Sequence, residues 1–350
     1  MKFSNFLFPE SRSPENDITI IEDSLREAVL SDQLGFDAIW LAEHHFDGGC
    51  AYVDPVTFAA AIGATTNNIK IGFAVAQMAL HHPTRFAEQI ALIDNITKGR
   101  IIVGVGRGTA YNFYEFRGYG VDPSEAQSRL LEFEEILVGA WTRENYKHSG
   151  KFWQIDVPVL RPKVYQSPHP PIVRACSSLE STLEMARLGR PFLMNIQSND
   201  VTIDRINQYR ATMLDSGFTE ESVQTNLSQS WIWRNVFVAD TDREAEEIGI
   251  PCFRDMRAYL SDNRSRMNTK EELQRQSAAT TGAARDSIDH GLIFGSPQKV
   301  YEELSKLNQT GIGGMIIHFR LGPMSWDATE NSLRLFSEEV MPELQASSQS

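Results

Sequence analysis

Three ionisable residues in a row, Glu43, His44 and His45, directly follow the short apolar segment Ala38–Leu41. An apolar segment that ends abruptly in polar residues is typical of a buried strand whose carboxyl end opens onto a loop. In folds built on parallel strands, catalytic groups usually lie just beyond those carboxyl ends. Because adjacent side chains point in different directions, we expect at most one of the two histidines to face a site there. An imidazole in that place could hold or transfer a proton near neutral pH.

Two other roles for that imidazole are compatible with the sequence. It could be a structural hydrogen-bonding group, or it could bind a metal ion. A protein metal site needs ligands that converge from several parts of the chain. No later strand end carries an H-x-H pair or a group of aspartates. We therefore expect no metal.

A glycine-rich segment carries residue types that can bind a phosphate. Gly104–Gly108 places Arg107 among glycines at the end of the apolar segment 101–105. Glycine lets the backbone approach a ligand closely, and an arginine can bind a phosphate through two hydrogen bonds. The segment could equally be a tight turn whose arginine pairs with a carboxylate.

A second possible phosphate site lies in the segment Cys176–Thr182, which follows an apolar segment and opens a helix. Ser178, Ser181 and Thr182 would there surround free N–H groups that attract an anion. Ordinary capping of the helix by serine explains the same residues. For this segment alone, capping is the simpler interpretation. Together with Arg107 on the neighbouring strand, a shared phosphate becomes plausible.

Small residues follow Phe73 in the segment Phe73-Ala74-Val75-Ala76. A strand end of this kind would let a flat ring lie against the backbone. Packing inside a core explains the same pattern, so the segment by itself does not indicate a ligand.

The elements that would position these residues alternate regularly along the chain. Eight apolar segments alternate with segments of helical spacing: 3–8, 38–41, 69–76, 101–105, 172–175, 192–195, 229–238 and 314–319. Such alternation predicts a parallel sheet, and eight repeats over 350 residues fit a closed (β/α)8 barrel better than an open sheet. We therefore expect an α/β protein that forms a single (β/α)8 TIM barrel domain over residues 1–350.

Two segments depart from this alternation. Residues 142–171 are rich in proline and irregular, and we expect an excursion there before the fifth strand. Residues 261–290 are polar, and a structureless segment of this length is usually a lid or is disordered. We predict a long mobile lid loop over the mouth of the barrel. A partly helical surface insertion without a role is the alternative.

Composition narrows the possible partners and the compartment. The chain is 41% hydrophobic and 23% charged, with a net charge of −13 and a pI of about 5.1. Such an acidic surface argues against nucleic acid or an anionic membrane as a partner. Cys50, Cys176 and Cys252 are widely spaced and indicate neither a disulfide framework nor a zinc cluster. No segment has the apolar length of a signal peptide or a membrane span, which predicts a soluble, cytoplasmic protein.

Several motifs also occur in an order that is specific for one family. They are the opening MKFSNFL, then GFDAIWLAEHHF, HHPTRFAEQIALIDNITKGR, the VGRG loop and the closing EEVMPEL. A chain with these motifs resembles the bacterial-luciferase-like flavin-dependent monooxygenases. It is especially similar to the luciferase α subunit and its alkanal-monooxygenase relatives. The resemblance is strong over residues 1–130 and poor over residues 142–171 and 196–290.

This resemblance implies a (β/α)8 barrel that binds FMN at the carboxyl ends of its strands. His44 would lie beside the reactive edge of the flavin and act as the acid/base group. A cis peptide bond at the end of the third strand would support the flavin ring, and an arginine with a serine-rich helix start would hold the phosphate. The positions that match these FMN-binding residues are Ala74, Val75, Arg107, Ser178, Leu179, Ser181 and Thr182.

The reaction implied by the resemblance is two-component monooxygenation. A separate flavin reductase would supply reduced FMN, dioxygen would add at flavin C4a, and the peroxide would oxygenate a small apolar or carbonyl substrate. The family also suggests a homodimer formed through the helices around 55–66 and 83–97. Apolar residues of these helices that are consistent with such a contact are Phe58, Phe86, Ile90 and Ile93.

Two departures from luciferase bear on the substrate. Gly106 stands where luciferase has a cysteine beside the flavin, and Phe113 stands where it has an acid. These changes argue against light emission and against long-chain aldehydes as substrates, and they leave flavin binding intact.

Two rival functions remain open in the sequence. One is a deazaflavin-dependent dehydrogenase, whose cofactor has an acidic tail and would need extra basic residues; Arg174 and Arg190 are the only candidates we find. The other is a non-catalytic partner subunit like the luciferase β chain. The retention of His44 and Arg107 argues against the second rival.

Overall fold

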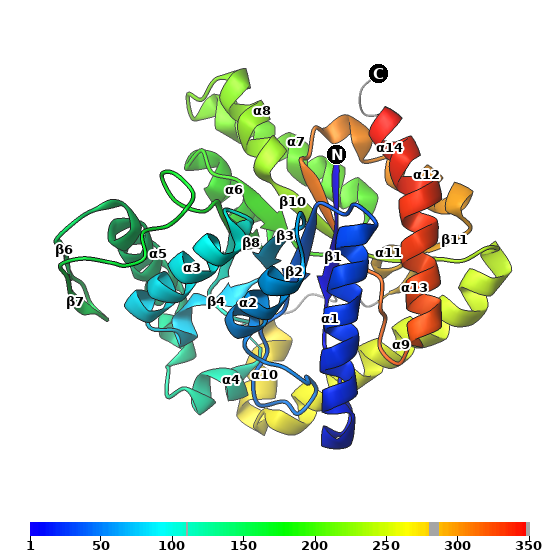
Figure 1. Ribbon diagram of the computed structural model, residues 1–350, viewed down its shortest axis with the longest axis horizontal. Helices are drawn as coiled ribbons and strands as arrows, with labels where there is room; N and C mark the ends of the chain where they lie inside the picture. The colour runs from blue at the N-terminus through cyan, green and yellow to red at the C-terminus, as the bar shows by residue number, and fades with distance from the viewer. Residues whose placement is uncertain (110, 280–286, 348–350) are drawn as a thin grey trace.

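A closed barrel of parallel strands forms the centre of the computed structural model, which describes residues 1–109, 111–279 and 287–347 (Figure 1). Around the ring, the strands are β1 (Lys2–Leu7), β2 (Ala38–Leu41), β3 (Lys70–Phe73), β5 (Ile101–Gly106), β8 (Ile172–Cys176), β9 (Phe192–Met194), β10 (Trp231–Val238) and β12 (Gly314–His318). β12 pairs with both β10 and β1 and so closes the ring. The predicted (β/α)8 barrel is confirmed.

Helices surround the barrel because each has an apolar face that the strands can bury. They include α1 (Asp17–Gln33), α2 (Pro55–Thr65), α3 (Pro83–Thr97), α5 (Ala126–Thr142), α6 (Leu179–Arg187), α7 (Asn199–Asp215), α12 (Pro297–Ser305), α13 (Trp326–Leu335) and α14 (Met341–Ser347). Two short helices, α4 (Phe113–Gly118) and α8 (Glu220–Gln229), and the short outer strand β11 (Ile293–Gly295) were not predicted. Over the described residues, none of the helices combines the length and apolar character needed to cross a membrane.

The apolar residues of α2 and α3 face the barrel. Phe86 and Ile90 are fully buried, and Phe58 and Ile93 are 7% and 4% exposed. Their spacing places them on the inner faces of their helices, where they belong to the core. The interpretation of these four residues as a dimer contact is therefore wrong. Leu92, which is 52% exposed, is an apolar residue on the outer face of α3.

The third predicted strand is interrupted at the point where the resemblance placed an unusual peptide bond. β3 ends at Phe73, and the chain resumes as β4 (Ala76–Gln77), which pairs with β5. The intervening peptide bond between Ala74 and Val75 is cis, which confirms that prediction.

The excursion before the fifth barrel strand is confirmed, but it is more regular than expected. It contains β6 (Tyr146–Ser149) and β7 (Gln154–Val157), which pair as an antiparallel hairpin outside the barrel.

The predicted mobile loop over residues 261–290 is wrong for the part that the structure describes. α9 (Asp242–Met267) continues into this segment, and α10 (Lys270–Ala279) and α11 (Ile288–Gly291) follow; residues 280–286 lie outside the described residues. In Figure 1, α10 lies below the carboxyl ends of the strands, close to α4. An ion pair of 2.6 Å between Arg117 of α4 and Glu272 of α10 joins the two helices.

Close packing inside the barrel wall leads to a first prediction, at Gly104 of β5. A Cβ atom at this position would lie 1.7 Å from the backbone oxygen of Phe73. We expect Gly104→Ala to lower the free energy of unfolding by more than about 3 kcal/mol or to prevent folding, because neither strand can move without disrupting the barrel. Urea unfolding measures this loss.

Gly217→Ala is the matched control. Gly217 has a φ of +90° but open space around its Cβ position, so the substitution costs only the backbone penalty of about 1–2 kcal/mol. Equal losses for the two variants would show that the contact between β3 and β5 does not require glycine.

Candidate active site

A cavity of about 310 Å³ lies at the carboxyl ends of the barrel strands. That volume is at the lower end of the range for small-molecule sites. Residues within the barrel strands or just beyond their carboxyl ends line it, and one face of α9 (Asp242–Met267) forms a further wall. The cavity lining includes Phe6, Phe8, Glu43, His44, Asp47, Ala74, Val75, Gly106, Arg107, Tyr111, Cys176, Ser177, Trp233, Met256, Arg257, Leu260, Arg264 and His318.

The cavity brings together four of the predicted site residues, namely His44, Ala74, Val75 and Arg107. The other four predicted residues, in the segment 178–182, are absent from its lining among the described residues. Cys176 and Ser177, which directly precede that segment, reach the cavity instead. The carboxyl ends of the strands therefore meet at one cavity, as expected. The start of α6 lies beyond the residues that line this cavity.

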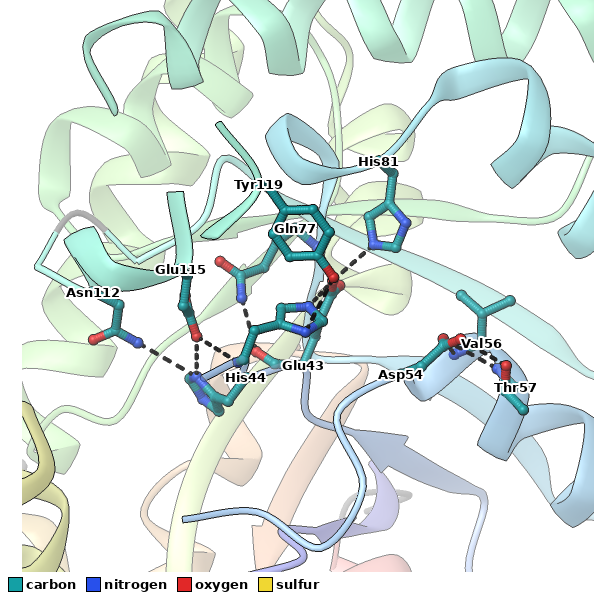
Figure 2. Close-up of polar contacts among 11 residues, drawn as sticks. Glu43, His44, Asp54, Val56, Thr57, Gln77, His81, Asn112, Glu115 and Tyr119 are labelled. Atoms are coloured by element: carbon teal, nitrogen blue, oxygen red, sulfur yellow. Dashed lines mark hydrogen bonds and ion pairs between the residues drawn. The ribbon is translucent and has the colours of Figure 1, made fainter. Parts of the chain in front are cut away.

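His44 is held by a buried carboxylate of α4 (Figure 2). Its Nδ1 lies 3.2 Å from Oε1 of Glu115, which also accepts the backbone N–H of His45 at 3.0 Å. Glu115 is fully buried, whereas the His44 side chain is 25% exposed toward the cavity. A proton on Nδ1, donated to Glu115, leaves Nε2 of the neutral imidazole free to accept a proton. This is the arrangement expected of a general base or acid.

Glu115 was not among the site residues predicted from the sequence. The residue lies 71 positions from His44, and only the packing of α4 beside the end of β2 brings the two side chains together.

The negative charges of Glu115 and Asp47 affect the pKa of His44. Burial lowers its pKa, but the hydrogen bond and the negative charge of Glu115, together with the charge of Asp47, raise it more, so the pKa lies above the usual value. Because the folded-state pKa is raised, the pair stabilises the fold fully below the pKa of the unfolded chain. That contribution is lost as the pH rises through the folded-state pKa.

Glu115→Gln tests this pair. The amide retains the shape of the side chain and removes its charge, so we expect the pKa of His44 to fall below its wild-type value. Titration of the His44 imidazole by ¹⁵N NMR measures the change. Glu88→Gln, at an exposed residue of α3, should leave the pKa unchanged. An unchanged pKa in Glu115→Gln would mean that the carboxylate does not control His44.

A second carboxylate, Glu43, has a structural role. One of its oxygens contacts Nε2 of His45 at 2.8 Å and Nε2 of His81 at 2.7 Å, and the other accepts the backbone N–H of Gln77 (Figure 2). Burial would raise the pKa of Glu43, but the two imidazoles outweigh it and lower the pKa to about 2. Glu43 therefore ties the end of β2 to β4. His45 is 4% exposed, and His44 is the histidine that lines the cavity.

Metal binding is not supported by any cluster of side chains. In the described ranges 1–109, 111–279 and 287–347, no group of three or more histidine, cysteine, aspartate or glutamate residues could hold a metal ion.

Arg107 is exposed and has no hydrogen bond or ion pair with a described residue. The alternative that it pairs with a carboxylate is thus wrong within the described residues. By contrast, Arg174 and Arg190 both contact the buried Glu134, the latter at 2.9 Å. These two arginines therefore form ion pairs within the protein.

The serine-rich helix start forms a reciprocal cap. The hydroxyl of Ser178 accepts the N–H of Ser181 at 3.2 Å, and the hydroxyl of Ser181 accepts the N–H of Ser178 at 3.1 Å. Thr182 is fully buried, and its hydroxyl donates to the carbonyl of Ser178. Leu179 is the first residue of α6. Helix capping therefore accounts for these hydroxyls, and a phosphate role for them stays a prediction.

Two buried groups that the sequence did not single out also line the cavity. Nε1 of Trp233 and Nε2 of His318 have no hydrogen-bond partner among the described residues. Burial lowers the pKa of His318 to about 3, so its imidazole is neutral. Both side chains pack against Phe6, at ring distances of 4.5 and 5.3 Å, and neither of them carries a charge.

Comparison with known proteins fits this geometry. The model of a family described as luciferase-like monooxygenase matches residues 1–313. The chain belongs to this family. The resemblance that the sequence motifs indicated is therefore confirmed.

Curated relatives of this luciferase-like monooxygenase cover nearly its whole length. It is 26% identical to the oxygenase component of a flavin-dependent trigonelline monooxygenase from Acinetobacter baylyi, over 98% of this chain and 95% of the relative. It is 23% identical to an alkanal monooxygenase alpha chain from the Kryptophanaron alfredi symbiont, over 99% of both chains.

Two solved structures share its fold. One is the oxygenating constituent of 3,6-diketocamphane monooxygenase from Pseudomonas putida, in complex with FMN, with a TM-score of 0.78, 21% identity and 98% coverage of both chains. The other is an F420-dependent secondary alcohol dehydrogenase, with a TM-score of 0.74, 16% identity and 98% coverage of both chains. At these identities, the likeness concerns the fold alone.

Proposed function

We propose that this luciferase-like monooxygenase is the FMN-dependent oxygenase of a two-component system. It would use reduced FMN and dioxygen to oxygenate a small organic substrate. The observation that carries the proposal is the meeting of His44, the Ala74–Val75 segment and Arg107 around one cavity. These groups supply a proton acceptor, a surface for a flat ring and a cation for a phosphate.

The residues present fit FMN. Gly106 has no side chain, and a Cβ there would lie 2.5 Å from Cγ2 of Val75, so the wall beside the cis peptide stays thin. Arg107 has no carboxylate partner among the described residues and is the cation we assign to the phosphate. The helix start with Ser178, Leu179, Ser181 and Thr182 would add the positive end of a helix dipole.

Reduced FMN, when bound, supplies the electrons that activate dioxygen. The chain's own contribution is then proton transfer and exclusion of water. Nε2 of His44 would accept a proton from a reacting group and return it, while Glu115 holds the ring in one tautomer. Phe6, Phe8 and Trp233 line the same cavity and would keep water from the reacting atoms.

The proposal also concerns partners. One relative is named as an oxygenase component, which supports a separate flavin reductase as the source of reduced FMN. We also propose a homodimer. Leu92 and Ile96 on the outer face of α3, which are 52% and 45% exposed, support an apolar contact at that helix.

A deazaflavin-dependent dehydrogenase is the second candidate, since a protein of that class shares the fold. Arg174 and Arg190, the basic residues that could have met an acidic tail, are both paired with Glu134. Neither of these two residues is therefore available for such a tail. A non-catalytic subunit is the third candidate, and the intact pair of His44 and Glu115 argues against it.

Anaerobic binding titrations distinguish the three candidates. Photoreduced FMN and reduced F420 are each titrated into the protein under argon, and binding is followed by fluorescence. We expect FMN to bind more tightly than F420. Tighter binding of F420 would favour the dehydrogenase, and no binding of either cofactor would favour the non-catalytic subunit.

A further inference from the structure

Helix α9 presents a cationic and apolar face to the cavity. Met256, Arg257, Leu260 and Arg264 all line it, and their spacing puts them on one side of the helix. The two arginines are seven residues apart, which corresponds to about 10 Å along the helix axis. They therefore reach different ends of the cavity.

The electrostatic effects of the two arginines agree with this placement. Besides burial, the charge of Arg257 contributes to the low pKa of His318. The charge of Arg264 acts at the other end: burial and Glu115 have the larger effects on the pKa of His44, and Arg264 opposes the rise. A cation thus lies close enough to the proposed proton-transfer group to affect its titration.

Arg264 has no carboxylate to neutralise it among the described residues. Its guanidinium lies over the ring of Tyr111, 4.6 Å from the ring centroid. A stacked guanidinium leaves its N–H edge available for a planar anion. The chain as a whole carries a net charge of −13, so an arginine without an acidic partner beside this cavity calls for a ligand.

The two acidic residues that line the cavity, Glu43 and Asp47, do not neutralise Arg264. Glu43 contacts His45 and His81, and Asp47 accepts the backbone N–H of Gly49. In the described residues, neither has an ion pair with Arg264.

We propose that Arg264 binds an anionic group of the substrate, so that the substrate is an apolar molecule of aromatic size that carries a carboxylate or a similar negative group. Phe8, Trp233 and Leu260 would surround its apolar body. This inference rests on the proposed function, because Arg107 then holds the FMN phosphate and Arg264 is left for the second ligand.

The test uses two isosteric probes, 2-naphthoate and its neutral analogue 2-naphthamide. Their binding to the wild type and to Arg264→Gln is measured by calorimetry, without flavin and with FMN present. We expect the wild type to bind naphthoate about tenfold more tightly than naphthamide, and Arg264→Gln to lose that preference. Arg254→Gln, at an exposed residue of α9 outside the cavity, should retain it and so controls for long-range charge.

The FMN measurements separate this inference from the proposed function. Titration with FMN and riboflavin shows whether Arg264 binds the flavin phosphate instead. An Arg264→Gln variant that loses affinity for FMN and keeps affinity for riboflavin would overturn the inference, as would equal binding of naphthoate and naphthamide to the wild type. A loss of naphthoate preference with FMN affinity unchanged would establish it. Failure of the wild type to bind reduced FMN would overturn the proposed function, whatever the result with naphthoate.

Discussion

His44→Asn should lower turnover by about 10²- to 10⁴-fold, which is the usual contribution of a positioned acid/base group. Asparagine can still hydrogen-bond Glu115, so the fold around the site is maintained. We expect FMN affinity to change little, because the imidazole is assigned to proton transfer. The measurement is the rate of product formation in single turnovers of enzyme-bound reduced FMN, with dioxygen in excess.

The control for this prediction is His82→Asn. His82 is exposed at the start of α3 and does not line the cavity, so its replacement should leave turnover unchanged. A drop in turnover of similar size in both variants, or retention of turnover in His44→Asn, would mean that His44 is not the acid/base group.

Arg107→Gln should weaken FMN binding by about 10- to 100-fold, because a hydrogen bond to a charged group contributes about 1.5–3 kcal/mol. Riboflavin, which has no phosphate, should bind the variant and the wild type equally. Quenching of flavin fluorescence measures both affinities. The comparison of the two flavins isolates the phosphate from the ring.

Arg143→Gln, at an exposed residue that precedes the outer hairpin, controls for the loss of one positive charge. Equal loss of riboflavin and FMN affinity in Arg107→Gln would contradict a phosphate role for this arginine. It would mean instead that the substitution disturbs the glycine-rich segment.

The barrel could be predicted because its signal is local. Each strand is a short apolar segment, and the order of strands in a (β/α)8 barrel follows the order of the chain. Residues at strand ends, such as His44 and Arg107, could therefore be placed at one mouth of the barrel by their sequence positions alone. Glu115 could not be placed in this way, because it contacts His44 only through the packing of α4. The sequence around Glu115 contains no motif that indicates this contact.

A partly helical insertion was only the alternative prediction for residues 261–290, because the composition of this segment is polar. A reciprocal cap marks the start of α10: the N–H of Thr269 donates to the carboxylate of Glu272 at 2.7 Å, and the N–H of Glu272 donates to the hydroxyl of Thr269 at 3.2 Å. The T-x-x-E pattern of such a cap is visible in the sequence and could have indicated this helix. Polar residues can form helices whose outer faces remain in water.

The function of the serine-rich segment could not be predicted from the sequence for a different reason. Helix capping and anion binding use the same residue types at the same place, because both satisfy free N–H groups at a helix start. Ser178 and Ser181 form the cap in the structure, and only a binding measurement decides whether they also meet a phosphate.

The most direct test of the proposed monooxygenase is a stopped-flow experiment with the wild type and His44→Asn. Photoreduced FMN is bound to each protein under argon and mixed with oxygenated buffer, and the return of oxidised-flavin absorbance is followed. We expect the wild type to delay that return well beyond the time for free flavin, and His44→Asn to shorten the delay. Reoxidation at the rate of free flavin in both proteins would contradict the role of this cavity in flavin-dependent oxygen activation.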